Sequence, residues 1–297
     1  MVSGTVPKAF SPHANYSKRL LSLYGDQTDE YGFNCDALFK CEFFSRYLYE
    51  EYFQVQTIGI ENIPANKRAI LIGNHSGVVP LDAFMTYTAF LNTHQNPRRI
   101  RFLVHNWLLS TPGVRDIIKG AGGVGATYKN ARKLLDQDEL VFFYPEGPKG
   151  TGKPFSMRYR LDDFDPGFVK AAIETQSPII PVTTVGGDEV FPLLANMKSI
   201  ARIMGTPYWP VTLTHPWLPF TTSCMPLPVK LLIIIGKPIY LDYPTSKCTD
   251  RQLRKDIARN IQYKIQRQLN QLLKIRKSPF SKWDLESVNK MENENEN

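Results

Sequence analysis

Two spacings of apolar residues alternate along the chain. Continuous apolar runs of roughly four to eight residues between turn-forming Gly, Pro and Asn are typical of buried strands. Apolar residues that recur every three or four positions are typical of amphipathic helices. The first spacing predicts strands at 69–73, 101–104, 139–144 and 178–186, and one or two further strands within 229–241. Alternating apolar and polar residues predict a strand at 54–64, and 122–126 is expected to be a short strand or turn.

The helical spacing fills the intervals between these strands. Strands that alternate with helices predict an α/β fold, in which a mostly parallel central sheet carries helices on both faces. Extra helices are expected at both ends of the chain, and the last one begins at Thr249, where Thr249 to Gln252 fits a capping box. The helices are expected at 34–53, 81–91, 128–136, 166–176 and from 249 onward.

The same pattern predicts how the chain is divided. The first residues, up to about position 30, carry too few apolar side chains to be anchored, and the final MENENEN is of low complexity. No linker rich in Pro or Gly interrupts the middle, which favours one domain. We expect an N-terminal segment with an aromatic helix at 1–55, an α/β core at 56–248, a basic helix packed on the core at 249–282 and a disordered tail at 283–297.

The charge balance narrows the class of partner. The 297 residues include 36 basic and 28 acidic side chains, a net charge of +8. This favours anionic partners such as nucleic acid, anionic lipid, or phosphorylated and CoA-linked substrates. We expect no nucleic-acid partner, because nothing resembles a nucleic-acid module and the aromatic residues are not interleaved with the basic cluster. The four cysteines lack metal-ligand spacing, so we expect no metal and reduced cytoplasmic thiols.

Membrane-spanning segments are not expected. The N-terminal MVSGTVPKAF lacks the apolar core of a signal peptide, and no apolar run approaches the ~20 residues of a spanning helix. We therefore expect a cytoplasmic protein that is soluble or peripheral to the membrane. The aromatic helix at 34–53 and the basic helix from 249 could each contact a bilayer. The alternative is that the aromatic residues belong to the core and the basic face is simply solvated.

Residues 147–154, GPKGTGKP, have the spacing of a phosphate-binding P-loop. A P-loop needs N–H groups that cradle phosphates and a Ser or Thr after its lysine to hold Mg²⁺. Here Pro154 follows Lys153 and offers no hydroxyl, and Pro148 removes one N–H group. We interpret the segment as a mobile Gly/Lys loop, and nucleotide binding is kept as a minor alternative.

A polar loop after the strand at 69–73 carries a histidine. In open α/β sheets ligands bind beyond the carboxyl ends of the strands, where this loop places Asn74, His75 and Ser76. Ser76 could in principle be a nucleophile, but the chain has no G-x-S-x-G elbow. His75 is therefore the candidate base, with Asn74 and Ser76 as candidate substrate contacts.

Asp82 is the candidate partner of His75. A histidine base needs an acceptor for its second ring nitrogen, and Asp82 is the only carboxylate between Glu61 and Asp116. On one straight helix seven residues would separate the pair by ~10 Å, so a dyad requires the loop to fold back before the helix begins. The alternative is an unpaired loop histidine and an Asp82 that only favours the helix N-terminus.

Three segments together resemble a known family. GNHSGVVPLD at 73–82, YPEGPKG at 144–150 and SPIIPV at 177–182 are similar, in order and spacing, to blocks of the glycerolipid acyltransferase family, typified by lysophosphatidic acid acyltransferases. The resemblance implies acyl transfer from acyl-CoA or acyl-carrier protein to a glycerolipid hydroxyl, with no cofactor. The expected acceptor is a lysophospholipid such as lysophosphatidic acid, in phospholipid biosynthesis or remodelling.

The resemblance also implies roles for individual residues. We expect the backbone N–H groups at the start of the helix at 81 to stabilise the oxyanion. The implied roles are general base for His75, its orientation for Asp82, acceptor binding for Glu146 and Gly147, a phosphate contact for Lys149, and the shaping of an acyl or acceptor pocket for Pro181.

The chain departs from the family pattern in its first two blocks. Six residues instead of four separate His75 from Asp82, so a dyad requires the two extra residues to bulge outward. The second block lacks a clear counterpart of the arginine that grips an acceptor phosphate. It offers Lys129, Arg132 and Lys133 instead.

The third block departs as well. Pro148 and Lys149 replace the Thr-Arg that follows Glu-Gly in the family, so Lys149 supplies a point charge without a bidentate fork. Two alternatives therefore stay open. The acceptor could be a neutral glyceride or a lipid-like alcohol, or the chain could be an inactive lipid- or CoA-binding protein of the same fold.

Overall fold

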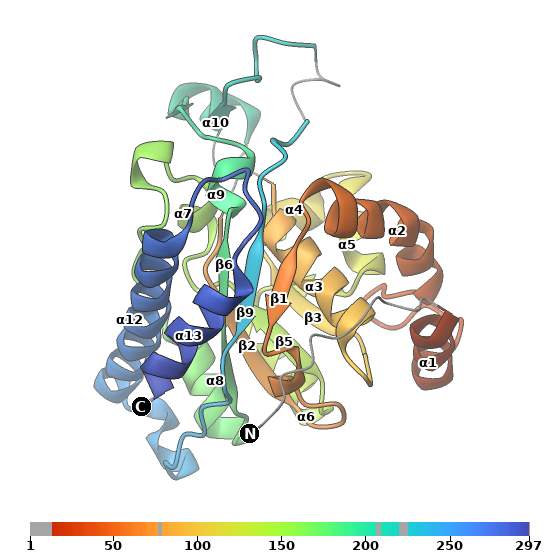
Figure 1. Ribbon diagram of the computed structural model, residues 1–297. Coiled ribbons are helices and arrows are strands. Elements are labelled where there is room, and N and C mark those ends of the chain that lie inside the picture. The colour runs from red at the N-terminus through yellow and green to blue at the C-terminus, as the bar shows by residue number, and fades with distance from the viewer. Residues whose placement is uncertain (1–13, 77–78, 206–208, 220–224, 297) are drawn as a thin grey trace.

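Seven strands form the central sheet within residues 14–76, 79–205, 209–219 and 225–296, the parts of the chain that the computed structural model describes. Their order is β1-β9-β6-β2-β5-β3-β4 (Figure 1). The strands from β6 to β4 run parallel, whereas β9 is antiparallel to β6 and parallel to β1. The bounds are β1 Gln56–Ile58, β2 Ala69–Gly73, β3 Ile100–Val104, β4 Gly123–Gly125, β5 Leu140–Phe143, β6 Ile179–Val185 and β9 Leu232–Ile235.

This arrangement confirms the predicted α/β fold and brings the polar loops together. At the centre of the sheet, Ile70 of β2 lies opposite Val141 of β5 and Ile179 of β6. Because these strands are parallel, the residues that follow them emerge at one edge of the sheet. This edge carries His75 after β2 and Tyr144 after β5.

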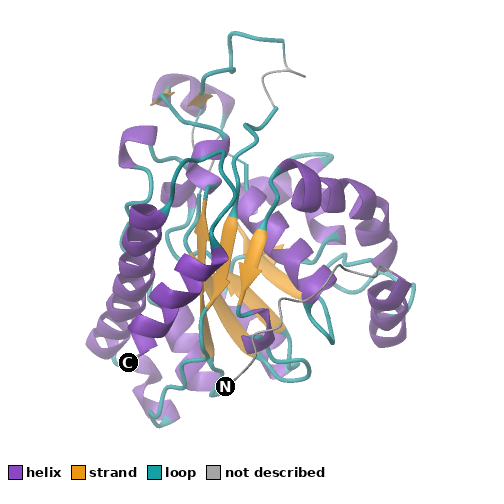
Figure 2. Ribbon diagram, in the orientation of Figure 1, coloured by secondary structure: helices purple, strands orange, loops and turns teal. Residues whose placement is uncertain are grey.

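Helices cover both faces of the sheet (Figure 2). The alternation along β2 sends Leu71 into a core shared with α2 and α3, and Ile70 and Ile72 into a core shared with α6, α8, α12 and α13. All five residues of β2 are buried, as a strand covered on both faces requires. The α-helices are α1 Ala14–Tyr24, α2 Cys35–Tyr47, α3 Leu81–Thr93, α4 Asn106–Ser110, α5 Val114–Gly120, α6 Tyr128–Asp136, α7 Pro148–Thr151, α8 Gly167–Thr175, α9 Gly187–Val190, α10 Lys198–Met204, α12 Arg251–Ile275 and α13 Leu285–Glu296.

Shorter elements complete the fold. A two-stranded sheet of β7 and β8 lies in the segment that connects α9 to β9. None of the helices in the described part of the chain is long and apolar enough to cross a membrane. The remaining elements are the π-helix η1 Leu48–Tyr52, the 3₁₀ turns η2 Ile60–Asn62, η3 Phe155–Met157 and η4 Thr245–Thr249, and the strands β7 Ala195–Asn196 and β8 Pro210–Val211.

Several predicted boundaries are corrected by the structure. The helix predicted at 34–53 is α2 followed by the π-helix η1. The strand predicted at 54–64 is shortened to β1, because Gly59 takes a left-handed φ of 76° and η2 follows. The late apolar segment forms β9 and an isolated bridge between Ile239 and Ile179. The capping box at Thr249 is wrong by one residue, since Asp250 accepts the Leu253 N–H at 3.1 Å.

Both ends of the chain are more ordered than predicted. α1 lies within the first 30 residues, and residues 1–13 lie outside the described part of the chain. The predicted disordered tail at 283–297 instead contains α13. Trp283, Val288 and Met291 are buried in the second core, and Gln268 of α12 donates to Glu292 at 2.9 Å. The polar sequence MENENEN did not predict this helix, because the buried apolar residues of the helix region lie before that repeat or at its first position.

Candidate active site

A histidine and a carboxylate meet where β2 ends and α3 begins. His75 follows β2 by two residues, and Asp82 lies in the first turn of α3. Nδ1 of His75 is 2.9 Å from Oδ2 of Asp82, which is hydrogen-bond distance. The six-residue spacing therefore does not keep the pair apart. The loop between them includes residues 77 and 78, which lie outside the described part of the chain.

The Asp82 carboxylate is fixed by backbone donors. Its side chain is fully buried. Oδ2 also accepts the Ser76 N–H at 3.0 Å, and Oδ1 accepts the Ala83 N–H at 2.8 Å. The N-terminus of α3 adds a favourable dipole for a negative charge. These contacts hold one carboxylate oxygen toward the His75 ring.

The contact with Asp82 leaves the other ring nitrogen of His75 open. When Nδ1–H donates to Asp82, Nε2 keeps its lone pair. Nε2 has no hydrogen-bond partner among the described residues, and 15% of the His75 side chain is exposed. A neutral imidazole held in this way can accept a proton from a bound hydroxyl.

The ring of Tyr144 packs against the imidazole ring of His75. Its ring stacks on the His75 ring with centroids 4.1 Å apart and planes at 23°, and Phe142 stacks on its other side at 4.7 Å. Burial raises the pKa of the Tyr144 hydroxyl well above its usual value, so this side chain stays neutral. The sequence analysis did not predict this contact, although Tyr144 is the first residue of the YPEG motif.

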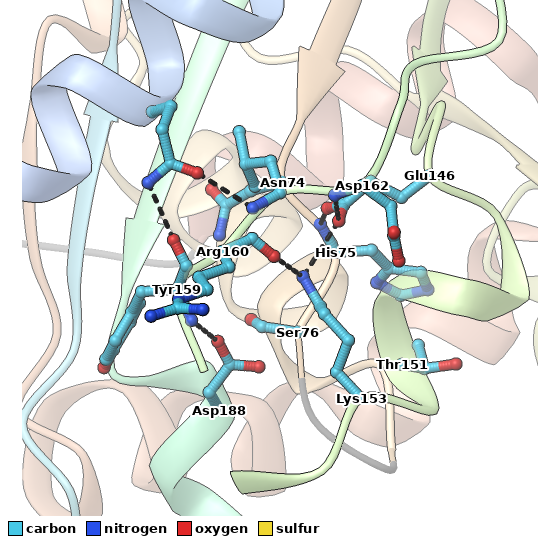
Figure 3. A network of polar contacts seen from close by, with 12 residues as sticks. Asn74, His75, Ser76, Glu146, Thr151, Lys153, Tyr159, Arg160, Asp162 and Asp188 are labelled. Atoms are coloured by element: carbon cyan, nitrogen blue, oxygen red, sulfur yellow. Dashed lines mark hydrogen bonds and ion pairs between the residues drawn. The ribbon is translucent and has the colours of Figure 1, made fainter. Parts of the chain in front are cut away.

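Glu146 contacts His75 through the backbone of the histidine. Its buried carboxylate accepts the His75 backbone N–H at 3.1 Å through Oε1. Oε2 accepts Nζ of Lys153 at 2.8 Å and the Asp162 N–H at 2.9 Å, and Lys153 also donates to the Arg160 carbonyl at 2.8 Å (Figure 3). The carboxylate is thus occupied by protein donors. The expectation that Glu146 binds the acceptor directly is not supported by these contacts.

The segment interpreted as a mobile Gly/Lys loop is instead the short helix α7. It begins after Gly147, whose φ of 59° few other residues adopt. A side chain at Gly150 would come within 2.9 Å of Cβ of His75, so α7 packs closely against the histidine. Lys149 is exposed on α7, whereas Lys153 is buried against Glu146. The P-loop alternative loses its support, because Lys153 has its anion within the protein.

Asn74 and Ser76 hold the loop rather than open into a site. Asn74 is buried and exchanges two hydrogen bonds with the Thr184 backbone, at 3.0 and 2.8 Å, which join the end of β2 to β6. Oγ of Ser76 is buried without a hydrogen-bond partner among the described residues and packs on Gly187, where a Cβ would lie 2.1 Å away. The predicted substrate contacts of these two side chains stay predictions.

The predicted oxyanion donors at the start of α3 are engaged elsewhere. The Leu81 N–H donates to the Val79 carbonyl at 2.7 Å, and the Ala83 N–H donates to Asp82. These two groups therefore contribute to the fold of the loop and to the orientation of Asp82.

Comparison with known proteins identifies the family. A sequence model described as Acyltransferase matches residues 54–185, which include β1 to β6 and the His75 site. An uncharacterized protein of Mycobacterium leprae is 38% identical over 264 residues, which cover 87% of this chain and 71% of the relative. An uncharacterized protein of Mycobacterium tuberculosis is 35% identical over 264 residues, covering 87% and 73%. The chain belongs to the acyltransferase family.

A solved structure shares the fold of this acyltransferase. It is the crystal structure of the 1-acyl-sn-glycerophosphate (LPA) acyltransferase PlsC from Thermotoga maritima, with a TM-score of 0.53 and coverage of 81% of both chains. At 20% sequence identity the match shows a common fold. The resemblance that the three sequence blocks indicated is confirmed at the level of family and fold.

Pro181 and the basic residues of the second block lie outside the hydrogen bonds and ion pairs that His75 forms among the described residues. Pro181 lies inside β6, opposite Ile72, and shares a strand face with Thr183, whose hydroxyl contacts Gln268 of α12. Its predicted role in shaping an acyl or acceptor pocket stays a prediction. In the second block, Arg132 and Lys133 pair with Glu174 at 2.7 Å and Glu30 at 2.6 Å.

Proposed function

We propose that this acyltransferase moves a fatty acyl group from the thioester of acyl-CoA or acyl-carrier protein to a glycerolipid hydroxyl, with His75 as general base. The observation that carries the proposal is the 2.9 Å contact between His75 Nδ1 and Asp82, which leaves Nε2 open. The same contact argues against an inactive binding protein with a separated dyad.

The chemistry follows from the orientation of the ring. Nε2 takes the proton of the acceptor hydroxyl as its oxygen attacks the thioester carbonyl, and Asp82 stabilises the imidazolium that forms. The tetrahedral intermediate then collapses, the carbon–sulfur bond breaks, and the departing thiolate takes the proton from Nε2. The products are an ester and a free thiol. This reaction needs no cofactor, because its atoms and protons balance with the acyl thioester and the acceptor hydroxyl alone.

A lysophospholipid such as lysophosphatidic acid is the acceptor that we favour. The solved structure that shares this fold is described as an acyltransferase for 1-acyl-sn-glycerophosphate. Lys149 is exposed on α7, the helix that packs against His75, and can meet a phosphate from there. A neutral glyceride or lipid-like alcohol is the second candidate, because Lys149 lacks the fork of an arginine.

A lipid acceptor requires contact with a membrane surface, and α2 offers exposed aromatic residues for it. Phe43, Phe44 and Tyr47 are 84%, 59% and 49% exposed. Aromatic side chains suit the bilayer interface. The apolar stripe of α12 is not available, since Ile261, Ile265 and other residues of that stripe are buried in the second core. We propose a peripheral association through the α2 side of the molecule.

Release of free thiol from long-chain acyl-CoA tests the proposal. Wild type and His75→Ala are compared with lysophosphatidic acid, other lysophospholipids, glycerol 3-phosphate, monoacylglycerol and diacylglycerol as acceptors. We expect acceptor-dependent release by wild type that is lost in the variant. Retained turnover in His75→Ala would refute the base assignment. If wild type released no thiol from either acyl-CoA or acyl-carrier protein, the proposal that this protein is an active enzyme would be refuted.

A further inference from the structure

Between α9 and β9 the chain leaves the sheet beside the site, and the structure describes its residues 191–205, 209–219 and 225–229, which are called segment 191–229 below. It follows α9, whose Gly187 packs on Ser76, and it contains β7, α10 and β8. The Phe155 N–H donates to the Leu193 carbonyl at 2.7 Å, which ties the start of the segment to the chain just after Lys153. In Figure 1, α10 stands beyond the edge of the sheet where β6 ends, on the same side as α7 and α9.

This segment exposes many large apolar side chains. Ile203 is 83% exposed and Trp217 is 69% exposed. Singly exposed apolar residues need no explanation, but contiguous exposed apolar patches mark interaction sites. Here the exposed apolar residues share one segment. The exposed members are Leu194, Met197, Ile203, Leu213, Trp217, Leu218 and Met225.

The charge of the segment has a single sign. No Asp or Glu occurs from Phe191 to Leu241, whereas Lys198 and Arg202 lie within 191–229. Arg202 is exposed next to Ile203. An apolar surface with only basic charges fits an anionic lipid surface, where each Lys or Arg near the headgroups is favourable. A second copy of this chain, with a net charge of +8, offers a poorer electrostatic match.

The segment adjoins the exposed aromatic residues of α2. The Tyr52 hydroxyl donates to the Pro226 carbonyl at 2.5 Å, and Nζ of Lys230 donates to the Tyr52 carbonyl at 3.1 Å. The Tyr52 ring in turn lies 6.4 Å from the Tyr47 ring. The apolar residues of segment 191–229 and those of α2 are therefore joined through Tyr52.

We propose that segment 191–229 docks the protein on an anionic bilayer, with Trp217 and Leu218 inserted at the interface and α2 beside them. This proposal rests on the proposed function for the identity of the lipid acceptor. It adds a specific surface on the side of the sheet where His75 lies, so an acceptor could pass from the bilayer to the base without crossing water.

Vesicle flotation tests the docking surface. Wild type, the double variant Trp217→Ser/Leu218→Ser and the control Tyr240→Ser are mixed with phosphatidylcholine vesicles, with and without phosphatidylglycerol. Tyr240 is 75% exposed and follows β9, which runs antiparallel to β6, so it lies at the other edge of the sheet. We expect binding to anionic vesicles that falls at least about tenfold in the double variant. The control should bind like wild type.

A second readout keeps the result independent of folding and of catalysis. Lipids brominated on their acyl chains should quench the tryptophan fluorescence of wild type more than that of Trp217→Phe, which keeps an apolar ring. Equal quenching, or wild-type vesicle binding by the double variant, overturns the proposal. The proposal is also overturned if the double substitution changes the oligomeric state of the protein and leaves vesicle binding unchanged.

Activity separates this proposal from the proposed function. With a short-chain, water-soluble acceptor and no vesicles, the double variant should turn over like wild type. If wild type transfers no acyl group to any acceptor but its vesicle binding depends on Trp217 and Leu218, the enzyme assignment fails and the docking surface stands. If transfer depends on His75 but the double variant still binds vesicles, the docking surface fails alone.

Discussion

Two buried carboxylates contact His75, and they contact different parts of it. Asp82 contacts the imidazole ring, whereas Glu146 accepts the backbone N–H of the same residue. Exposed fractions of 1% and 4% show that burial does not distinguish them. Their partners do. Asp82 contacts the ring that would take up a proton in the proposed mechanism, while Glu146 contacts the ammonium group of Lys153.

This comparison distinguishes a carboxylate that would act in proton transfer from one that stabilises the fold. A buried pair of fixed charges adds little net stability, but removing one partner leaves an uncompensated charge in the protein interior. A carboxylate beside an imidazole instead gains importance when the imidazolium forms. Substitutions at Asp82 should therefore lower the rate, and substitutions at Lys153 should lower the stability.

Of the substitutions at the two carboxylates and their partners Lys153 and Tyr144, Asp82→Asn should give the largest effect on turnover. The amide keeps the shape of the carboxylate but favours the wrong tautomer of His75 and cannot stabilise an imidazolium, so we expect kcat to fall by about 10²- to 10⁴-fold. Thiol release measures the rate, and thermal unfolding serves as the control. An unfolded variant would instead make Asp82 a structural cap of α3, and unchanged turnover would exclude the dyad.

Lys153→Met should give the largest effect on stability. It leaves the buried Glu146 carboxylate without its cation, which costs about 3–5 kcal/mol of the free energy of unfolding. Denaturant titration measures this loss. The double variant Glu146→Gln/Lys153→Met removes both charges and should recover part of it. Equal losses in the single and double variants would show that the charge pair is not the cause.

The sequence predicted the repeating part of the fold well, because local spacing determines it. β2 and α6 lie at the residues that their apolar patterns indicated. His75 and Asp82 were found because a strand end and a helix start bracket them closely in sequence. The family resemblance then came from three short motifs, each of which follows a strand or lies within one.

The second carboxylate role could not be predicted from the same signals. Glu146 contacts residues at positions 75, 153 and 162, and these come together only after α7 folds against the loop. No spacing rule relates these positions, and the motif around Lys153 suggested a phosphate site instead. α13 was missed for a similar reason, since Val288 and Met291 are too few to predict a helix without the core that receives them.

Tyr144 sharpens the comparison because it contacts the ring without carrying charge. Tyr144→Ala removes the stacked wall and should lower kcat/KM by up to about tenfold, the size of an aromatic contact. Tyr144→Phe keeps the ring and should behave like wild type. Because the pKa of the Tyr144 hydroxyl is raised, its ionisation should contribute no alkaline limb to the rate. Similar losses in both variants would assign a role to the hydroxyl instead.

The smallest expected effect concerns the two lysines of the GPKGTGKP segment, of which Lys149 is exposed and Lys153 is buried. Lys149→Ala should leave stability unchanged and raise KM for phosphorylated acceptors by about two- to fivefold, as expected for one solvated charge contact. KM for a neutral glyceride should not change, and added salt should reduce the difference. Equal effects on both acceptors would argue against a phosphate contact. That result would favour the neutral acceptor, because Lys149 is the exposed lysine of this motif, whereas Lys153 is buried.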